Sequence, residues 1–237
     1  MGRGKKTRKA KLAAKAKQRK AIRKKMGKPI YLTLICCPRP IHRLINKFIY
    51  KATIHRTSYK QAIIQNVRWQ ASSLTYCTFS DSHCVGVDFL NSNLKNTSFK
   101  NAILEDVVFF NCNLKDANFT GVKFRRVVFI TTNTTVAKNL VLNENEKCYI
   151  YRMYPKLQLD SRTEQCLLQL SSIPALYNYG ILFVNKNKLN KWILQFFIDI
   201  YGYDSLEALV ALKGKRNKRF LYSIHSYMLH IERYLKL

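Results

Sequence analysis

A strict five-residue period between residues 62 and 130 constrains the fold of this chain more than any other feature. Each repeat has a large apolar residue or a cysteine at its centre: Ile64, Trp69, Leu74, Phe79, Cys84, Phe89, Leu94, Phe99, Leu104, Phe109, Leu114, Phe119, Phe124 and Phe129. Two residues before each centre stands a smaller side chain, from Ala62 through to Val127. A period of five matches neither the 3.6 residues of a helical turn nor the alternation of a strand. Fourteen successive repeats therefore predict a solenoid.

The repeat unit is a small residue, any residue, Leu or Phe, any residue, and then Asn, Asp or Gly. It resembles the repeat of the pentapeptide-repeat family and is clearest in residues 113–119. The resemblance implies a right-handed, four-sided β-helix with one pentapeptide on each side. The two apolar positions would fill the bore, and the turn-prone residue would lie at each corner. Three and a half coils give a rod of only about 17 Å, so the flanking segments must supply caps, function or both.

One side of the predicted solenoid turns from polar to apolar toward its C-terminal end. Residues twenty apart stack on the same side of a four-sided coil, so the outward positions form ladders. The apolar ladder comprises Leu90, Val108, Phe110, Val128 and Ile130. A contiguous apolar patch of this kind is rarely left in contact with water. We expect the C-terminal domain, or a second copy of the chain, to cover it.

The segments before the repeats are expected to contain two units. Residues 1–28 form a basic arm, which we interpret as disordered until it becomes helical on a polyanion. Residues 29–61 form a linker and an amphipathic helix from Ile41 to Ala52. The apolar face of that helix would either plug the open end of the first coil or bind a membrane surface or a partner.

The segments after the repeats predict a cap and a helical domain. Residues 131–160 are interpreted as a loop, followed by a strand between residues 147 and 154 that closes the last coil. Residues 161–237 have a helical period, which predicts a bundle of four or five helices. Ser161 with Glu164, and Asp204 with Glu207, predict capping boxes at two helix starts. The last helix, up to Leu235, also fits a short coiled-coil seam.

The formal net charge of +29 is concentrated near the N-terminus. Residues 1–70 hold 21 Lys and Arg and no Asp or Glu, whereas residues 71–130 hold 6 and 5. Blocks of like charge are typical of segments that fold on an anionic partner. The candidate nucleic-acid-binding residues are Arg3, Lys5, Lys6, Arg8, Lys9, Lys11, Lys15, Lys17, Arg19, Lys20, Arg23, Lys24 and Lys25, with a second run of Lys215, Arg216, Lys218 and Arg219.

No motif in the sequence predicts catalysis, a metal site or a cofactor. His225 and His230 lie five residues apart and do not share a helix face as two zinc ligands would. Glu105 and Arg125 stack one coil apart, which indicates a surface ion pair. The seven cysteines lack paired metal-ligand spacing and fit reduced thiols in the cytoplasm. No stretch reaches the roughly 20 apolar residues of a membrane span, and the N-terminus does not fit a signal peptide. We therefore predict a cytoplasmic, non-enzymatic protein without a small-molecule substrate.

Three binding functions remain open. The first is association with DNA, RNA or a ribonucleoprotein, in which basic side chains neutralise phosphates without reading sequence. The second is a protein scaffold that uses the apolar ladder and the helical domain. The resemblance implies a possible topoisomerase partner, because some family members mimic B-form DNA, but mimicry needs an acidic rod and this rod carries only about +1. The third is attachment to an acidic membrane surface.

Overall fold

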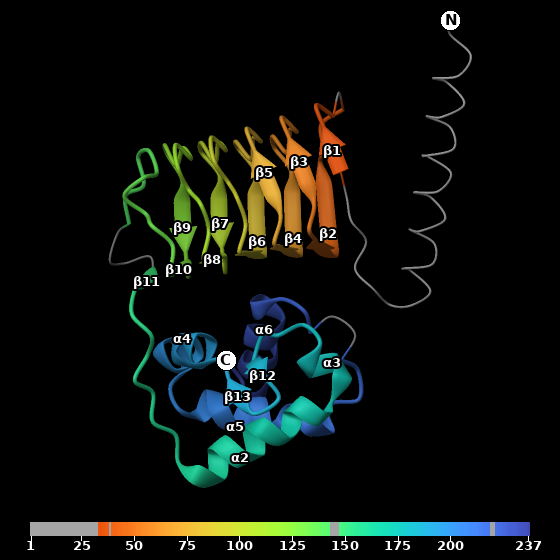
Figure 1. Ribbon diagram of the computed structural model, residues 1–237, viewed down its shortest axis with the longest axis vertical. Coiled ribbons are helices and arrows are strands. Elements are labelled where there is room, and N and C mark those ends of the chain that lie inside the picture. Colours follow the sequence, from red (N-terminus) through yellow and green to blue (C-terminus); the bar gives the residue numbers. More distant parts are fainter. Residues whose placement is uncertain (1–32, 38, 143–146, 219–220) are drawn as a thin grey trace, which may run out of the picture.

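The computed structural model describes residues 33–37, 39–142, 147–218 and 221–237. It shows a β-solenoid of about six turns followed by a small helical domain (Figure 1). The predicted basic arm, residues 1–28, lies outside the described residues. The solenoid strands are β1 (Thr33–Ile35), β2 (Arg43–Tyr50), β3 (Thr53–His55), β4 (Ile63–Gln70), β5 (Ser73–Thr75), β6 (His83–Leu90), β7 (Ile103–Glu105), β8 (Val108–Phe110), β9 (Lys123–Arg125), β10 (Val128–Ile130) and β11 (Tyr149–Tyr151).

The solenoid is four-sided, as the repeats predict. Every fifth residue from 46 to 131 has a positive φ, so the chain turns a corner once in each pentapeptide. Neighbouring coils pair in parallel with an offset of twenty residues, as where Val67 lies opposite Val87 and Phe89 opposite Phe109. Four corners in each twenty-residue turn give four sides. Most corner residues are Asn, Asp or Gly, which adopt the left-handed conformation at the lowest cost.

The bore is filled by side chains from the repeat centres. Two columns of stacked rings run along it, one formed by Tyr59, Phe79, Phe99 and Phe119 and the other by Trp69, Phe89, Phe109 and Phe129. Successive ring centroids are 4.6–5.2 Å apart. All eight side chains are buried. The columns confirm the predicted inward positions, because only a side chain repeated at each coil can stack in this way.

The amphipathic helix predicted between Ile41 and Ala52 is wrong. This segment contains strand β2, which pairs with β4 so that Leu44 lies opposite Ile64 and Ile49 opposite Trp69. Its apolar residues therefore continue the five-residue period, and their spacing of three and four only resembles a helix. The solenoid thus begins at β1, not at residue 62, and is longer than the expected three and a half coils. At its other end β11 pairs with β10, which confirms the predicted closing strand.

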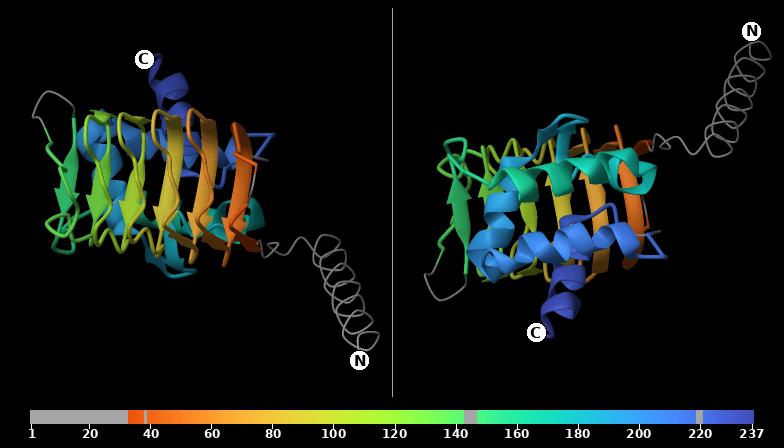
Figure 2. Two further views of the ribbon diagram at one scale, coloured as in Figure 1. Left: turned by 90° about the horizontal axis from the view of Figure 1, so that it is seen from above. Right: turned by 90° about the horizontal axis from the view of Figure 1, so that it is seen from below.

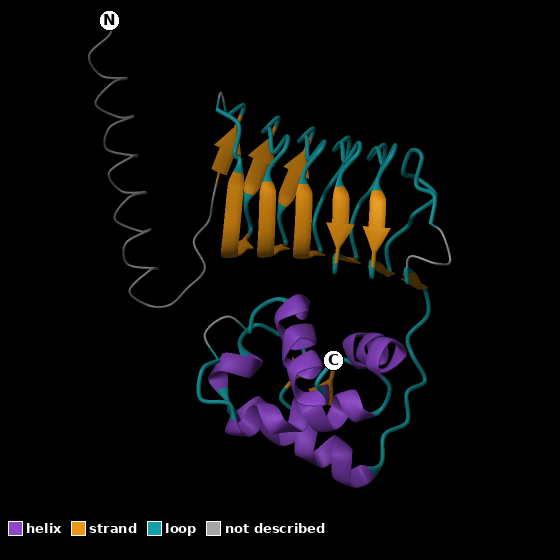
Figure 3. Cartoon of the chain, turned by 180° about the vertical axis from the view of Figure 1, so that it is seen from behind, coloured by secondary structure: helices purple, strands orange, loops and turns teal. Residues whose placement is uncertain are grey.

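The C-terminal domain is mainly helical, as predicted, and also contains a short hairpin that the sequence pattern does not indicate (Figure 3). Its elements are α2 (Ser161–Gln169), η2 (Leu170–Ser172), α3 (Pro174–Tyr177), β12 (Phe183–Asn185), β13 (Lys188–Leu189), α4 (Lys191–Tyr201), α5 (Asp204–Val210), η3 (Ala211–Gly214) and α6 (Ile224–Leu235). The predicted capping boxes are wrong. Asp160 caps α2 by accepting from the Thr163 N–H, and α5 has no side-chain cap.

The helical domain lies along one side of the solenoid (Figures 1 and 2). The chain leaves β11 and runs down past the end of the rod to α2, which is the helix farthest from the strands. Helix α6 then returns toward the solenoid and contacts β6. Residues far apart in the sequence therefore meet at a seam between α6 and one edge of the rod.

Candidate functional site: the seam and the basic end

The predicted apolar ladder is covered by the C-terminal domain. Val108, Val128 and Ile130 are fully buried and belong to one apolar cluster with the helical domain, including Leu194 and Phe197. Phe110 packs against the same cluster, and Leu90 is buried. The C-terminal domain is therefore the cover that the patch requires. These side chains are not free to bind a second copy of the chain or another protein, which corrects their assignment as an intermolecular interface.

Helix α6 also contacts a polar edge of the solenoid, which we call the corner ladder. It is formed by Asn66, Gly86, Asp106 and Arg126, one from each successive coil, all with positive φ. Ser223, the N-cap of α6, donates from its hydroxyl to the side-chain oxygen of Asn66. The next coil carries Gly86, where an added Cβ would lie 2.4 Å from the ring of His225. Only glycine leaves room for that ring.

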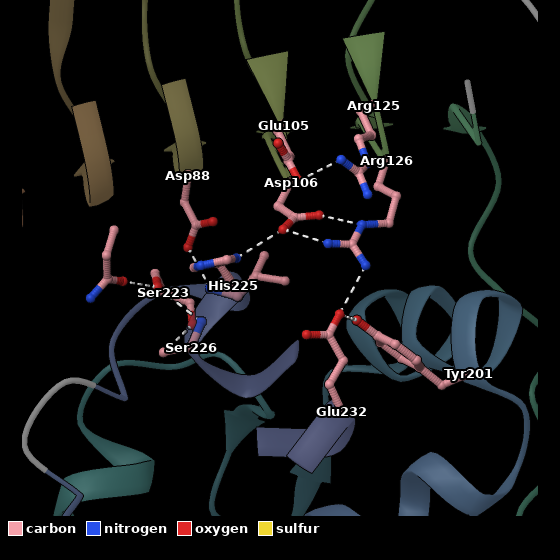
Figure 4. Close-up of polar contacts among 12 residues, drawn as sticks. Asp88, Glu105, Asp106, Arg125, Arg126, Tyr201, Ser223, His225, Ser226 and Glu232 are labelled. Carbon is pink, nitrogen blue, oxygen red and sulfur yellow. Dashed lines mark hydrogen bonds and ion pairs between the residues drawn. The ribbon is translucent and has the colours of Figure 1, made fainter. Parts of the chain in front are cut away.

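The corner ladder ends in a chain of charged contacts (Figure 4). His225 Nδ1 lies 2.9 Å from Asp106 Oδ2. Arg126 reaches both Asp106, at 2.6 Å from Nε to Oδ1, and Glu232 Oε1 on α6, at 2.8 Å. Tyr201 on α4 donates its hydroxyl to the same Glu232 oxygen at 2.8 Å. This series of contacts thus joins two coils of the solenoid to helices α4 and α6.

A second group of polar residues is buried on the docked face, which we define as the side of the solenoid that packs against the helical domain. Arg68 is 1 % exposed, donates to the Tyr222 carbonyl and to Gln70, and lies over the Phe48 ring. Asp88, in the next coil, is fully buried and accepts the N–H of Ile224 at 2.8 Å. That N–H belongs to the first turn of α6, where the helix dipole favours a carboxylate. Burial nevertheless raises the pKa of Asp88 to about 7, although Arg68 opposes the shift.

The charged groups of the seam contact one another across the two domains, so they hold the solenoid and the helical domain together. Within the described part of the chain, no group of three His, Cys, Asp or Glu side chains is placed to hold a metal ion.

Burial raises the pKa of the Cys84 and Cys112 thiols to about 12, so these sulfurs are not thiolates at neutral pH. The expected ion pair of Glu105 and Arg125 is present at 3.4 Å.

The predicted nucleic-acid-binding residues are only partly described. The arm residues from Arg3 to Lys25, and Arg219, lie outside the described residues. Lys215, Arg216 and Lys218 follow η3, and of these Arg216 is exposed and the two lysines are half-buried. The Lys218 ammonium donates to the Lys215 and Lys213 carbonyls, which closes the turn after η3.

The structure brings this C-terminal run beside the first coils of the solenoid. A cleft of about 320 Å³ is lined by Asn46 and Asn66 on the solenoid and by Lys215 and Arg233 on the helical domain. Residues 33–80 contain no Asp or Glu. We define the basic end as the exposed side chains of the first coils together with those around the cleft: Arg39, Arg43, Lys47, Lys51, Arg56, Lys60, Lys215, Arg216, Lys218 and Arg233. The absence of acid before Asp81 is the sequence signal for it, but Arg233 could not be placed without the structure.

Comparison with known proteins gives a family match within the solenoid. Residues 72–109 match the family model described as pentapeptide repeats, in 8 copies. No curated protein sequence matches the chain significantly. Among solved structures, the chain is similar to the pentapeptide-repeat protein Rfr23 from the cyanobacterium Cyanothece 51142, with 14% identity, a TM-score of 0.33, and coverage of 51% of this chain and 97% of that one.

Two further solved structures are similar to part of the chain. A pentapeptide-repeat protein of the Arabidopsis thaliana thylakoid lumen is 19% identical, with a TM-score of 0.30 and coverage of 54% of this chain and 75% of that one. Full-length QnrB1, a plasmid-mediated fluoroquinolone resistance protein, is 11% identical, with a TM-score of 0.20 and coverage of 60% and 98%. The five-residue period, the left-handed corners and the family match together make the solenoid of this chain a pentapeptide-repeat β-helix.

Proposed function

We propose that this protein is a non-enzymatic nucleic-acid-binding protein that associates with RNA, DNA or a ribonucleoprotein through its basic arm and its basic end. The observation that carries the proposal is the electrostatic asymmetry of the solenoid. Its first coils present exposed Arg and Lys and no carboxylate, and the folded chain adds Lys215, Arg216 and Arg233 at the same place. Phosphates are the anions that such a surface neutralises with release of counterions.

The proposed binding depends on the positions of the phosphates and not on the base sequence. Lys and Arg side chains on a rigid rod contact phosphates at fixed spacing, and such contacts orient the nucleic acid without reading bases. The arm carries 14 Lys and Arg in residues 1–28 and no acid, so it would extend the same contact surface. We expect little discrimination among base sequences and a strong dependence of affinity on salt.

Fluorescence anisotropy with labelled RNA and duplex DNA tests the proposal. The affinity of the full chain should fall by about 10³-fold or more between 50 and 200 mM salt if six or more phosphates are contacted. Deleting residues 1–28 should reduce the slope of log affinity against log salt. Replacing Lys100 and Lys115, two exposed lysines on later coils of the solenoid, is the matched control and should change the slope little. Absence of binding at 50 mM salt, or binding that salt does not weaken, would refute the proposal.

A protein scaffold is the second candidate, because pentapeptide-repeat proteins often serve as protein-interaction scaffolds. One face free of the helical domain carries Ile63, His83 and Ile103 in register, and the two isoleucines are 54% and 40% exposed. Introducing aspartate at Ile63 and Ile103 should abolish capture of a protein that co-purifies with the chain. Aspartate at Thr53 and Asn113, exposed on another face, is the control. Equal capture by both variants would exclude this face.

The membrane hypothesis has lost one of its two supports. Its inserting element was the amphipathic helix from Ile41 to Ala52, and that segment contains strand β2, in which Leu44 and Ile49 are packed in or against the bore. In the described residues, no helix is long and apolar enough to cross a membrane. The basic end could still contact acidic lipid, so vesicles serve as a comparison in the binding experiments.

A further inference from the structure

We propose that the cleft between the Asn46 corner and the C-terminal end of α6 binds one phosphate group, held by Lys215 and Arg233. The assignment of that phosphate to a nucleic-acid backbone rests on the proposed function, whereas the site itself does not. Sequence patterns do not indicate this site, because its walls come from residues 46 and 66 on one side and from residues after 214 on the other.

The walls of the cleft present hydrogen-bond donors. Asn66 donates its side-chain amide to Asn46 Oδ1 at 2.7 Å, which fixes the Asn46 side chain. The NH₂ group of Asn46 then has no partner among the described residues. Lys215 and Arg233 lie on the opposite wall. The apolar side chains of Leu221 and Leu229 also line the cleft and lower the local dielectric constant. Donors therefore face an opening with no carboxylate in its lining.

Without a bound anion, the cations around this cleft repel one another. Burial lowers the pKa of Lys215, and the positive charges of Arg233 and Lys218 lower it further. Lys218 is satisfied by backbone carbonyls, and Arg233 lies in the last turn of α6, where a cation is favourable. Neither of these roles applies to Lys215, whose ammonium has no hydrogen-bond or ion-pair partner among the described residues. A bound anion would convert the repulsion into attraction for all three cations.

The donor set fits a phosphate in particular. The guanidinium of Arg233 can bind two phosphate oxygens at once, and the Lys215 ammonium acts as a compact point charge. The cleft lining contains no aromatic ring on which a nucleobase could stack, so a free nucleotide would gain nothing from its base. The cleft adjoins the exposed Lys47 of β2, which could contact the next phosphate of the same strand. A phosphodiester backbone is therefore the occupant that the surroundings favour.

The experiment titrates the full-length protein with inorganic phosphate at constant ionic strength and follows backbone amides by NMR. Amides of Ser226, Leu229 and Arg233 should shift and saturate, with chloride as the control anion. The variant carrying Lys215→Gln and Arg233→Gln should lose these shifts, and Lys215→Arg should retain them. Arg233→Gln alone is the safeguard against misfolding, because Arg233 is exposed. Shifts that persist in R233Q and in the double variant, or that are absent in the wild type, overturn the site.

A second arm separates the site from the proposed function. The double variant should reduce the salt slope for RNA binding by about 1, as expected for one lost phosphate contact. The matched change of Lys100 and Lys115 to Gln should not. RNA binding with an unaltered slope overturns the assignment of the phosphate to a nucleic-acid backbone and leaves the proposed function standing. Phosphate binding without RNA binding would refute the proposed function and leave the phosphate site standing. Binding of phosphatidylserine vesicles, but not RNA, through the two residues overturns the nucleic-acid assignment.

Discussion

Replacing Gly86 by alanine tests how closely α6 is fitted to the corner ladder. Gly86 has φ +65°, a left-handed conformation in which a Cβ atom costs roughly 1–2 kcal/mol. The added atom would lie 2.4 Å from Cγ and Cδ2 of His225 and 2.6 Å from its Cβ. Because the Cβ of His225 is itself in the clash, rotating the ring gives no relief. Helix α6 must move away from β6.

That movement separates His225 from Asp106, a carboxylate that is 1 % exposed. A hydrogen bond to a charged group contributes about 1.5–3 kcal/mol, and Asp106 would keep only its contacts with Arg126. With the loosened packing of α6, we expect G86A to lower the free energy of unfolding by about 3–5 kcal/mol. Gly121 is the matched control, since it has φ +68° and its added Cβ would meet the end of the exposed Asn101 side chain, at 2.5 Å. That side chain can turn away, so G121A should cost only the strain of about 1–2 kcal/mol.

Urea denaturation followed by circular dichroism measures both variants, and a double-mutant cycle with H225A isolates the clash. In the H225A background the ring is absent, so G86A should cost no more than G121A does in the wild type. The reasoning is refuted if G86A and G121A destabilise the wild type equally. It is also refuted if the cost of G86A is the same with and without the His225 ring.

Three further predictions concern neighbouring features. R126A should cost about 2–4 kcal/mol in urea denaturation, because it removes the cation that pairs with the buried Asp106 carboxylate. R125A, on a side chain 70% exposed, should cost under about 0.5 kcal/mol; equal losses would contradict the role of the corner ladder. Asp88 has a pKa raised by burial to about 7 when folded, above its unfolded value, so the folded state binds the extra proton between those values. Stability should fall as pH rises from about 4 to 7, by at most about 1.4 kcal/mol per unit, and D88N should remove that slope in thermal melts; an unchanged profile would count against it. F99A removes a ring stacked at 5.1 and 5.0 Å on its neighbours and should cost about 3–5 kcal/mol, while Y76A, half exposed, should cost under about 1 kcal/mol, and similar thermal shifts for the two would argue against a packed aromatic column.

The bore of the solenoid could be predicted because its positions repeat. Phe89, Phe109 and Phe129 follow a spacing that neither helix nor strand explains, and they stack as that spacing requires. The first coil could not be predicted, because Lys47 stands where later coils have a small residue and is exposed at the open end. Without that signature, the apolar residues of β2 imitate a helix. Pairing with β4 overrides the local pattern by supplying a partner for each backbone group.

The seam could not be predicted because its contacts join residues more than 100 positions apart. His225 offers no metal pattern, and its partner Asp106 occupies an ordinary corner position. One signal was available, since Arg126 stands at a corner where Asn, Asp and Gly are usual. Lys51 and Arg56 are also cations at corners and are exposed, so a cation at a corner does not by itself predict a partner beyond the solenoid. The sequence therefore does not show that Glu232 is the partner of Arg126. The apolar ladder was found because burial needs only a face, whereas a hydrogen bond needs a specific atom.

The two parts of the docked face solve different problems. A solenoid presents nearly the same backbone at every coil, about 4.8 Å apart, so an apolar ladder such as Val108 and Val128 would hold a helix almost equally well after a slip of one coil. The corner ladder does not repeat, because successive coils carry Asn66, Gly86, Asp106 and Arg126. A slip would press the His225 ring against a side chain and remove its hydrogen bond to Asp106. Apolar burial therefore supplies most of the attraction, and the non-repeating polar residues select one docking position, as a buried polar residue selects register in a coiled coil.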